Sequence, residues 1–468
     1  MWGLRWLQLV LATAVVSMLM SNVLTFAFAV VCLPPPNASN YTGPLQRLTT
    51  AETQVLFSSF AWSALLATLP FLLMLRSIGK PSLPSLTRPE EEVVGGAQFS
   101  VLLVGSASGI GVLLTPMAAM RGGFAALLAC RLLSGVGYAS AFTLMGSVTA
   151  AWAGGKERGI FMGLLASATQ ISTIFTMFSS GWLCSSRAGW AGIYYLHAGV
   201  TIGLLIIWTL LYRDNPAKHP LISTHELALL EKGSEKRALA VPWLAMAKSA
   251  AVWAIAVAAL GNMLGIQFLV FYTPTYLRNI LGFDIRASGL LAALPPLLMF
   301  AVKFLAGALS DFSERWLGPT KGVKLFNSLA FFGLGGCLCL LAIGGLTPHS
   351  AYALLALGTA LLGFHSGGLF KSAAVIGGRL APVLLCLIQL LTCLVLTLCP
   401  FLVASLTQHQ TPTEWRRLFP LVGGVVMVSN IVFLFTASGK PQPWAQPEPA
   451  EPAQPGPFHP TASVDLQK

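Results

Sequence analysis

Three cationic side chains stand inside long apolar stretches of this sequence: Arg131, Lys303 and Lys371. The chain has 16 Asp and Glu residues, and none of them lies deep in such a stretch. An ionised side chain in the middle of a bilayer costs at least about 2.5 to 3.5 kcal/mol. Three cations without carboxylate partners should therefore face a water-filled cavity or bind an anion. The pattern predicts a binding site for a small anionic solute.

Each cation also has a plainer interpretation. Arg131 could bind backbone carbonyls near the outer face of the membrane. Lys303 lies two turns before Asp311 and could extend its ammonium group toward the cytoplasm. Lys371 follows Gly363–Gly368, a segment of small residues that lets helices approach closely, and could extend in the same way. We favour anion binding for Lys371 and give the two interpretations equal weight for Lys303.

Neutral polar residues in the apolar runs add candidates for the same site. Gln170 belongs to a stripe of Ser and Thr residues and is expected to line the cavity, with Asn262 as a weaker candidate. Such side chains also serve as hydrogen bonds between helices. His365 and His197 are the histidines within the apolar runs and therefore the conventional candidates for proton titration, although most buried histidines are only hydrogen-bonded.

The composition indicates the elements that must hold these side chains. Of 468 residues, 55% are hydrophobic and 9% are charged, against about 25% charged in soluble domains. Runs of about 20 apolar residues are long enough to cross a bilayer as helices, whereas barrel strands would be short and alternating. The sequence predicts an all-α polytopic membrane protein with twelve transmembrane helices: 7–31, 55–75, 99–117, 124–151, 160–183, 192–211, 250–277, 287–309, 325–346, 351–377, 380–406 and 418–436.

Charge asymmetry between the loops predicts the orientation. With a cytoplasmic N-terminus, 18 Lys and Arg residues lie inside and seven outside. The sequons at Asn37 and Asn40 then fall in the first outward loop, where they could be glycosylated. Both termini are expected in the cytoplasm of a plasma, endolysosomal or vesicular membrane. The net charge of +12 is explained by this topology and requires no nucleic-acid partner.

The remaining sequence signals are few. Cys32 and Cys184 lie near the predicted outer face and could pair. No spacing indicates a metal site, and no nucleotide-binding signature accompanies the glycine-rich runs, so we expect neither an enzyme nor a cofactor.

The chain divides near its middle into two sets of six helices. The predicted segments are a first half, 1–211, with an outward loop at about 32–54 and a cytoplasmic insert at about 76–98; a central cytoplasmic loop, 212–248; a second half, 249–439; and a disordered Pro-rich tail, 440–468. Two six-helix halves are the layout of the major facilitator fold. Gly307, Asp311 and Arg315 resemble that superfamily's inner-loop motif, in which the Gly permits close packing and the Asp caps a helix and pairs with a cation when the inner gate closes.

Several segments are similar to one branch of the superfamily, the anion:cation symporters: RLLSGVGYASAF (131–142), WAGGKER (152–158), RDNPAKHPLISTHE (213–226), VPWLAMAKSAAVWAI (241–255) and TPTYLRNILGF (273–283). This branch includes sodium-phosphate cotransporters, the sialic acid transporter, and the vesicular glutamate and nucleotide transporters. The resemblance implies that Arg131 binds the substrate and that Gln170 and Asn22 occupy family positions. Three positions depart from the family's charged residues: Tyr138 replaces an acid, Met20 an arginine and Ala259 a histidine.

We therefore expect a secondary active or facilitative carrier of small organic or inorganic anions, in which two halves rock around a midplane site. Arg131 would bind the anion, helped by Lys371 or Lys303. Because the acid at Tyr138 is missing, coupling to sodium, protons, membrane potential or anion exchange all stay open. A monomer in the lipid bilayer is favoured. Two alternatives are a carrier-like sensor or scaffold that does not transport and a facilitator carrier for a neutral solute.

Overall fold

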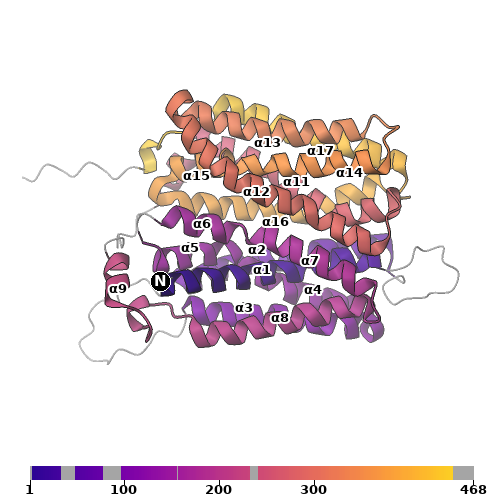
Figure 1. Ribbon diagram of the computed structural model, residues 1–468, viewed down its shortest axis with the longest axis horizontal. Coiled ribbons are helices and arrows are strands. Elements are labelled where there is room, and N and C mark those ends of the chain that lie inside the picture. Colours follow the sequence, from indigo (N-terminus) through magenta and orange to yellow (C-terminus); the bar gives the residue numbers. More distant parts are fainter. Residues whose placement is uncertain (1–2, 33–47, 77–95, 155–156, 232–240, 446–468) are drawn as a thin grey trace, which may run out of the picture.

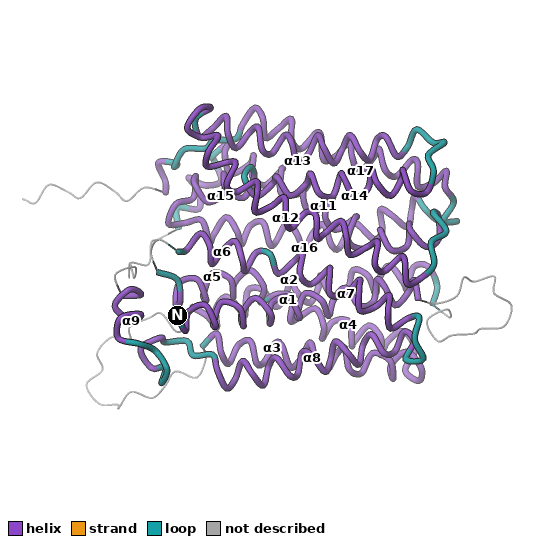
Figure 2. Tube along the Cα trace, viewed as in Figure 1, coloured by secondary structure: helices purple, strands orange, loops and turns teal. Residues whose placement is uncertain are grey.

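The computed structural model describes residues 3–32, 48–76, 96–154, 157–231 and 241–445. These residues form helices and connecting loops, with no β-strand among them (Figure 2). The predicted sequons at Asn37 and Asn40 lie outside the described residues, as do most of the predicted insert at 76–98 and most of the tail.

The first half consists of eight helices: α1 (Leu4–Cys32), α2 (Thr50–Arg76), α3 (Ala97–Met117), α4 (Gly123–Ala139), α5 (Ala141–Trp152), α6 (Arg158–Ala166), α7 (Ala168–Cys184) and α8 (Gly189–Leu211). The second half consists of α11 (Ala250–Thr275), α12 (Ile285–Leu317), α13 (Pro319–Leu341), α14 (Pro348–Leu362), α15 (Leu369–Gly377), α16 (Ala381–Leu406) and α17 (Pro412–Thr436). The short helices α9 (Thr224–Glu231) and α10 (Trp243–Ala247) lie between the halves in the sequence.

The helix pattern confirms the predicted all-helical membrane fold. Ten stretches of the described chain are long and apolar enough to cross a membrane. One of them, Ala97–Thr149, contains both α3 and the pair α4–α5, and α2 adds a further long helix. The arrangement therefore accommodates twelve crossings. Three of these crossings consist of two shorter helices in succession: α4–α5, α6–α7 and α14–α15.

The helices run side by side along the longest axis of the molecule (Figure 1). Helices α1–α8 lie together in the lower part of the view, and α11–α17 lie together above them. The first residue of α1 and the last residue of α17 lie at the same end of the bundle, and we call this the termini end. At the opposite end a disulfide joins Cys32, the last residue of α1, to Cys184, the last residue of α7, with a Cα–Cα distance of 5.7 Å. The predicted pairing is confirmed, and we call this the disulfide end.

The two halves contact each other closely at the disulfide end. A Cβ atom added to Gly289 of α12 would lie 2.6 Å from the Cα of Gly181 of α7, so only glycine fits at this crossing. On the other side of the bundle, the Ser58 hydroxyl of α2 donates to the Thr397 carbonyl of α16 over 2.9 Å. Two separate helix pairs therefore hold the halves together at this end.

At the termini end, part of the predicted central loop is folded onto the first half. Glu226 of α9 accepts hydrogen bonds from the backbone N–H groups of Leu4 (3.1 Å) and Arg5 (2.9 Å), which begin α1. Asp214 accepts from the N–H of Gln98 (3.1 Å) at the start of α3, and burial raises the pKa of this carboxyl. Because carboxylates stabilise the positive end of a helix dipole, the connection is anchored to two helices of the first half.

Two element boundaries differ from the prediction. Helix α12 continues to Leu317 instead of ending near Leu309, so the segment resembling an inner-loop motif lies within a helix. The predicted disordered tail does not begin at Lys440, because Gln442 N–H donates to the Ile376 carbonyl (3.3 Å) and residues Pro443–Ala445 form a short 3-10 helix.

Candidate functional site

A break between α6 and α7 exposes a backbone carbonyl at the contact between the halves. The N–H of Gln170 donates to the Ser167 carbonyl, so the Ala166 carbonyl lacks its usual helical donor. It accepts instead from the Lys303 ammonium of α12 (3.0 Å) and from the Thr169 hydroxyl (3.2 Å). The break thus supplies a neutral acceptor for a cation from the other half.

Lys303 joins the two halves through a second contact. Its Nζ also lies 3.3 Å from the side-chain oxygen of Gln170 on α7. Within the described residues Lys303 has no carboxylate partner, so its charge is held only by neutral oxygens. The structure brings these two predicted site residues together.

A second helix break lies beside Lys303, where the 3-10 helix η5 (Gly363–Ser366) separates α14 from α15. A Cβ on Gly363 would lie 2.7 Å from the Met299 carbonyl of α12, which confirms that small residues here permit a close helix approach. The Ser366 hydroxyl donates to the backbone carbonyl of Lys303 over 3.0 Å. The segment that carries His365 is therefore fixed against α12 at the level of Lys303.

His365 and Asn262 complete this arrangement. The ring Nδ1 of His365 lies 2.9 Å from the side-chain oxygen of Asn262 on α11, and both residues are buried. The His365 Nε2 and the Asn262 Nδ2 have no partner among the described residues. The charge of Lys303 acts on the His365 ring. We call Gln170, Asn262, Lys303 and His365 the central polar cluster.

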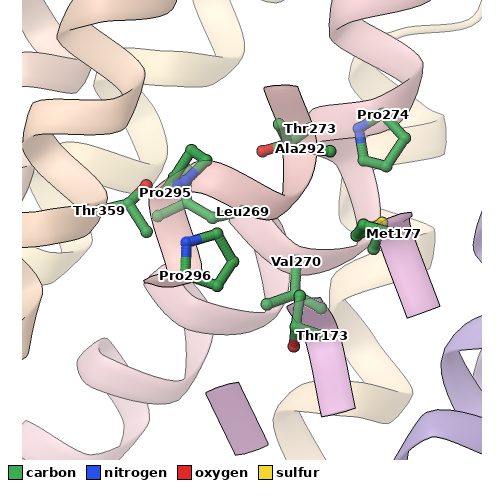
Figure 3. Close-up of a pocket in the computed structure, with 10 residues that line it drawn as sticks. All are labelled: Thr173, Met177, Leu269, Val270, Thr273, Pro274, Ala292, Pro295, Pro296 and Thr359. Atoms are coloured by element: carbon green, nitrogen blue, oxygen red, sulfur yellow. The ribbon is translucent and has the colours of Figure 1, made fainter. Parts of the chain in front are cut away.

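A small, mostly apolar cavity lies where α7, α11, α12 and α14 meet (Figure 3). It is lined by Thr173 and Met177 of α7, Pro295 and Pro296 of α12, and Thr359 of α14, together with residues of α11. Along α7 and α12 these positions fall between Gly181–Gly289 and Gln170–Lys303. The α7–α12 contact therefore has three levels: a tight crossing, a cavity and a polar cluster.

Arg131 lies elsewhere. Its Nε donates to the Leu56 carbonyl (3.1 Å) and its Nη1 to the Val23 carbonyl (3.1 Å), and the guanidinium stands over the rings of Phe26 and Phe60 at 5.0 and 5.3 Å. Its Nη2 has no partner among the described residues. At a rise of about 1.5 Å per residue, Arg131 lies about 12 Å from the start of α4, and Lys303 lies about 27 Å from the start of α12. Both helices start at the disulfide end. The structure does not bring Arg131 into the central polar cluster.

Lys371 corrects one expectation. The sequence suggested that all three intramembrane cations lack carboxylate partners, but the Lys371 ammonium forms an ion pair with Glu314 (3.0 Å) and contacts the Ser310 hydroxyl (3.2 Å). Helix α12 continues to Leu317, so Glu314 lies on this helix and can reach α15. The predicted helix end near Leu309 did not indicate this contact. Lys371 is therefore paired toward the termini end.

Asn22 and His197 lie within the first half, apart from the cluster. The Asn22 amide donates to the hydroxyls of Ser108 (3.1 Å) and Thr201 (3.0 Å), which links α1 to α3 and α8. His197 Nδ1 lies 2.8 Å from the Ile193 carbonyl of its own helix.

The predicted inner-loop motif lies in the last turns of α12. A Cβ on Gly307 would meet no atom of the described residues within 4 Å, so within that part of the chain this glycine makes no close helix contact. Arg315 is exposed, and the side chain of Asp311 lies outside the described residues. Tyr138, at the family's acidic position, is buried against the Phe60 ring and interacts with Gln267 of α11.

Sequence reasoning missed the groups that hold Lys303 and Lys371. The Ala166 carbonyl becomes an acceptor only because the helix breaks, which the continuous apolar run 160–183 does not indicate. Glu314 was assigned to a loop.

Comparison with known proteins identifies the family. The model of the Major Facilitator Superfamily matches residues 9–383. The chain is 30% identical to "Sialin" of Ovis aries over 348 residues, covering 72% of this chain and 69% of that protein. It is 27% identical to the "Probable small intestine urate exporter" of Mus musculus, covering 75% and 73%, and 29% identical to "Sodium-dependent phosphate transport protein 1" of Oryctolagus cuniculus, covering 68% and 70%.

Solved structures show the same fold. A bacterial homolog of the human lysosomal transporter Spinster, in an inward-facing and occupied conformation, superposes with a TM-score of 0.65 at 13% identity over 93% of this chain and 97% of that chain. A D-xylose-proton symporter superposes with a TM-score of 0.66 at 14% identity over 92% and 97%. Since the family model covers most of the chain and the sequence relatives are transporters of one branch, this protein is a multi-pass membrane transporter of the Major Facilitator Superfamily, in the anion:cation symporter family.

Proposed function

We propose that this protein carries small anions across its membrane by alternating access, with the anion bound at the central polar cluster. The observation that carries the proposal is Lys303, an ammonium group at the contact between the halves whose partners among the described residues are the neutral oxygens of Ala166 and Gln170. A charge held in this way within a bilayer attracts a counter-ion. A solute anion can supply the missing negative charge.

The position of the cluster supports this mechanism. Lys303, His365 and Asn262 belong to the second half and Gln170 to the first, so rocking of the halves changes the site's access. Both helix breaks, between α6 and α7 and at η5, meet at this level, and interrupted helices commonly form substrate sites in transporters. Urate and phosphate, named for two relatives, are anions.

Two further features belong to the proposal. Arg131, whose Nη2 has no partner among the described residues, would be a second anion contact nearer the disulfide end. We place the termini end in the cytoplasm because Lys and Arg are concentrated in the loops and tails on that side.

The test is uptake of labelled phosphate, urate, glutamate, sialic acid and ATP into proteoliposomes under imposed sodium, proton or voltage gradients. Lys303→Gln should reduce uptake of the transported anion at least about tenfold, since a charge-assisted hydrogen bond contributes about 1.5 to 3 kcal/mol. The matched control is Lys321→Gln, which neutralises an exposed lysine at the start of α13 and should leave uptake unchanged.

The proposal fails if folded wild-type protein moves no anion under any gradient. It also fails if Lys303→Gln and Lys321→Gln transport the anion equally well. Uptake of a labelled neutral sugar in place of every anion would indicate the neutral-solute carrier instead.

A further inference from the structure

The central polar cluster contains two buried polar atoms that no neighbour satisfies. His365 is 2% exposed and Asn262 is 0% exposed, yet the His365 Nε2 and the Asn262 Nδ2 have no hydrogen-bond partner among the described residues. Buried polar groups are normally paired. Two unpaired groups on neighbouring side chains leave a donor and a titratable nitrogen available to a ligand. They lie beside Lys303, which has no carboxylate partner among the described residues.

The hydrogen bond to Asn262 determines which ring nitrogen can accept a proton. The Nδ1–H of His365 donates to the Asn262 side-chain oxygen over 2.9 Å, so the neutral ring carries its lone pair on Nε2. A proton binding there forms an N–H bond and makes the ring a cation. The ring itself stays fixed, because Phe370 of α15 packs against it at 5.1 Å and Ser366 ties η5 to α12.

Lys303 is the charged group that acts on His365 in the described structure. The helices packed against η5 carry their other charges toward the helix ends. These are Arg286 at the disulfide end of α12, and Asp311, Glu314, Arg315, Lys321, Lys324 and Lys371 toward the termini end of α12, α13 and α15. Lys371 and Glu314 pair with each other, and the side chain of Asp311, two turns beyond Lys303, is outside the described residues. Helices α11 and α14 carry no Asp, Glu, Lys or Arg.

We propose that His365 takes up one proton with each anion that enters the central polar cluster, so that transport is driven by the proton gradient. The inference rests on the proposed anion transport and adds its coupling ion. Without an anion, Lys303 opposes a second positive charge on the ring. A bound anion removes that opposition, and by linkage the proton strengthens anion binding by the same factor.

The cycle balances in charge and atoms. The Nε2–H bond forms when the proton and anion bind from one side, and it breaks when both leave on the other side, which restores the neutral ring. One proton and one monovalent anion move together, so a monovalent substrate crosses without net charge. Tyr138, at the position where relatives carry an acid, is not required for this coupling.

The experiment measures uptake of labelled sialic acid and glutamate, whose carboxylates stay ionised across about pH 5.5 to 7.5, a range that brackets the ordinary pKa of histidine. In the wild type, an acidic exterior should drive accumulation without a voltage response, and the KM should fall several-fold between about pH 7.5 and 5.5. His365→Gln should abolish accumulation driven by the proton gradient while exchange of labelled for unlabelled anion continues.

The matched control is His197→Gln. His197 is equally buried and its Nε2 also has no partner among the described residues, but no charged group of those residues acts on its ring. This variant should keep the response to the proton gradient. Asn262→Asp gives a second readout, because a carboxylate that accepts the hydrogen bond from Nδ1–H stabilises the protonated ring. The pH dependence of KM should therefore move toward higher pH.

The outcomes separate the two proposals. If wild-type protein neither accumulates nor exchanges any anion of the full panel, anion transport itself is wrong. If anions are exchanged but His365→Gln still accumulates them with the proton gradient, or if His197→Gln alone abolishes that accumulation, the coupling by His365 is overturned and anion transport stands.

Discussion

Arg131 and Lys303 show how two buried cations in one protein are held in different ways. Arg131 uses two of its planar donors on the carbonyls of Leu56 and Val23 and is covered by Phe26 and Phe60. Lys303 is a compact charge with two acceptors in the part of the chain that the structure describes, Ala166 and Gln170. The guanidinium therefore links α1, α2 and α4 as well as carrying charge, whereas the ammonium group is the more available of the two for exchange of partners.

At Arg131 we predict that Arg131→Lys has two separable effects. An ammonium group cannot reach both carbonyls, so the unliganded protein should lose about 2 kcal/mol of stability, measured by thermal or denaturant unfolding in detergent. The stabilisation that a transported anion adds should also decrease, because the substitution removes Nη2, which has no partner among the described residues. An unchanged anion-induced shift would show that Arg131 is a structural residue only.

The sequence identified the residue types of the site but not their partners. A charge within an apolar run is conspicuous, so Arg131, Lys303 and Lys371 could be selected directly. Their acceptors come from other helices: Glu314 is far from Lys371 in the chain, and Leu56 and Val23 offer backbone carbonyls that any residue would have. Hydrogen bonds of this kind depend on helix packing, which a single sequence does not specify.

Among the elements, the helix spans were predictable and the interruptions were not. All twelve predicted spans correspond to helices or helix pairs, because apolar length is set by the bilayer. The breaks at Ser167 and Gly363–Ser366, however, lie inside unbroken apolar runs. They leave hydropathy unchanged while redirecting the Ala166 carbonyl and the His365 ring toward Lys303.

The α7–α12 pair gives a prediction for a single glycine. In Gly289→Ala the added methyl group would stand 2.6 Å from the Gly181 Cα and 2.8 Å from the Met177 carbonyl, both of which are backbone atoms that cannot turn aside. The two helices should separate at the disulfide end. A cysteine placed at Thr173 should then react several-fold faster with a membrane-impermeant thiol reagent applied from that end. Gly336→Ala in α13 is the control, because a methyl group there meets no atom of the described residues within 4 Å.

For the whole molecule, the described contacts hold the halves together at the disulfide end on two sides, through α7–α12 and α2–α16. Alternating access requires these contacts to part.

We predict that fixing the α2–α16 contact stops transport. Ser58→Cys with Thr397→Cys places two thiols within reach of a short cross-linker, since the Ser58 hydroxyl lies 2.9 Å from the Thr397 carbonyl. Cross-linking should abolish net uptake of the anion while binding from the termini side continues. Each single variant treated with the same reagent is the control for the native cysteines. Undiminished uptake after complete cross-linking would show that the halves do not separate here.

The Cys32–Cys184 bond also constrains how the protein is made. The cytosol keeps thiols reduced, so the disulfide agrees with the proposed orientation, in which the disulfide end faces away from the cytoplasm. Cys32 emerges 152 residues before its partner. The bond can therefore close only after the fifth crossing has been made, and once closed it joins the first crossing covalently to the fifth.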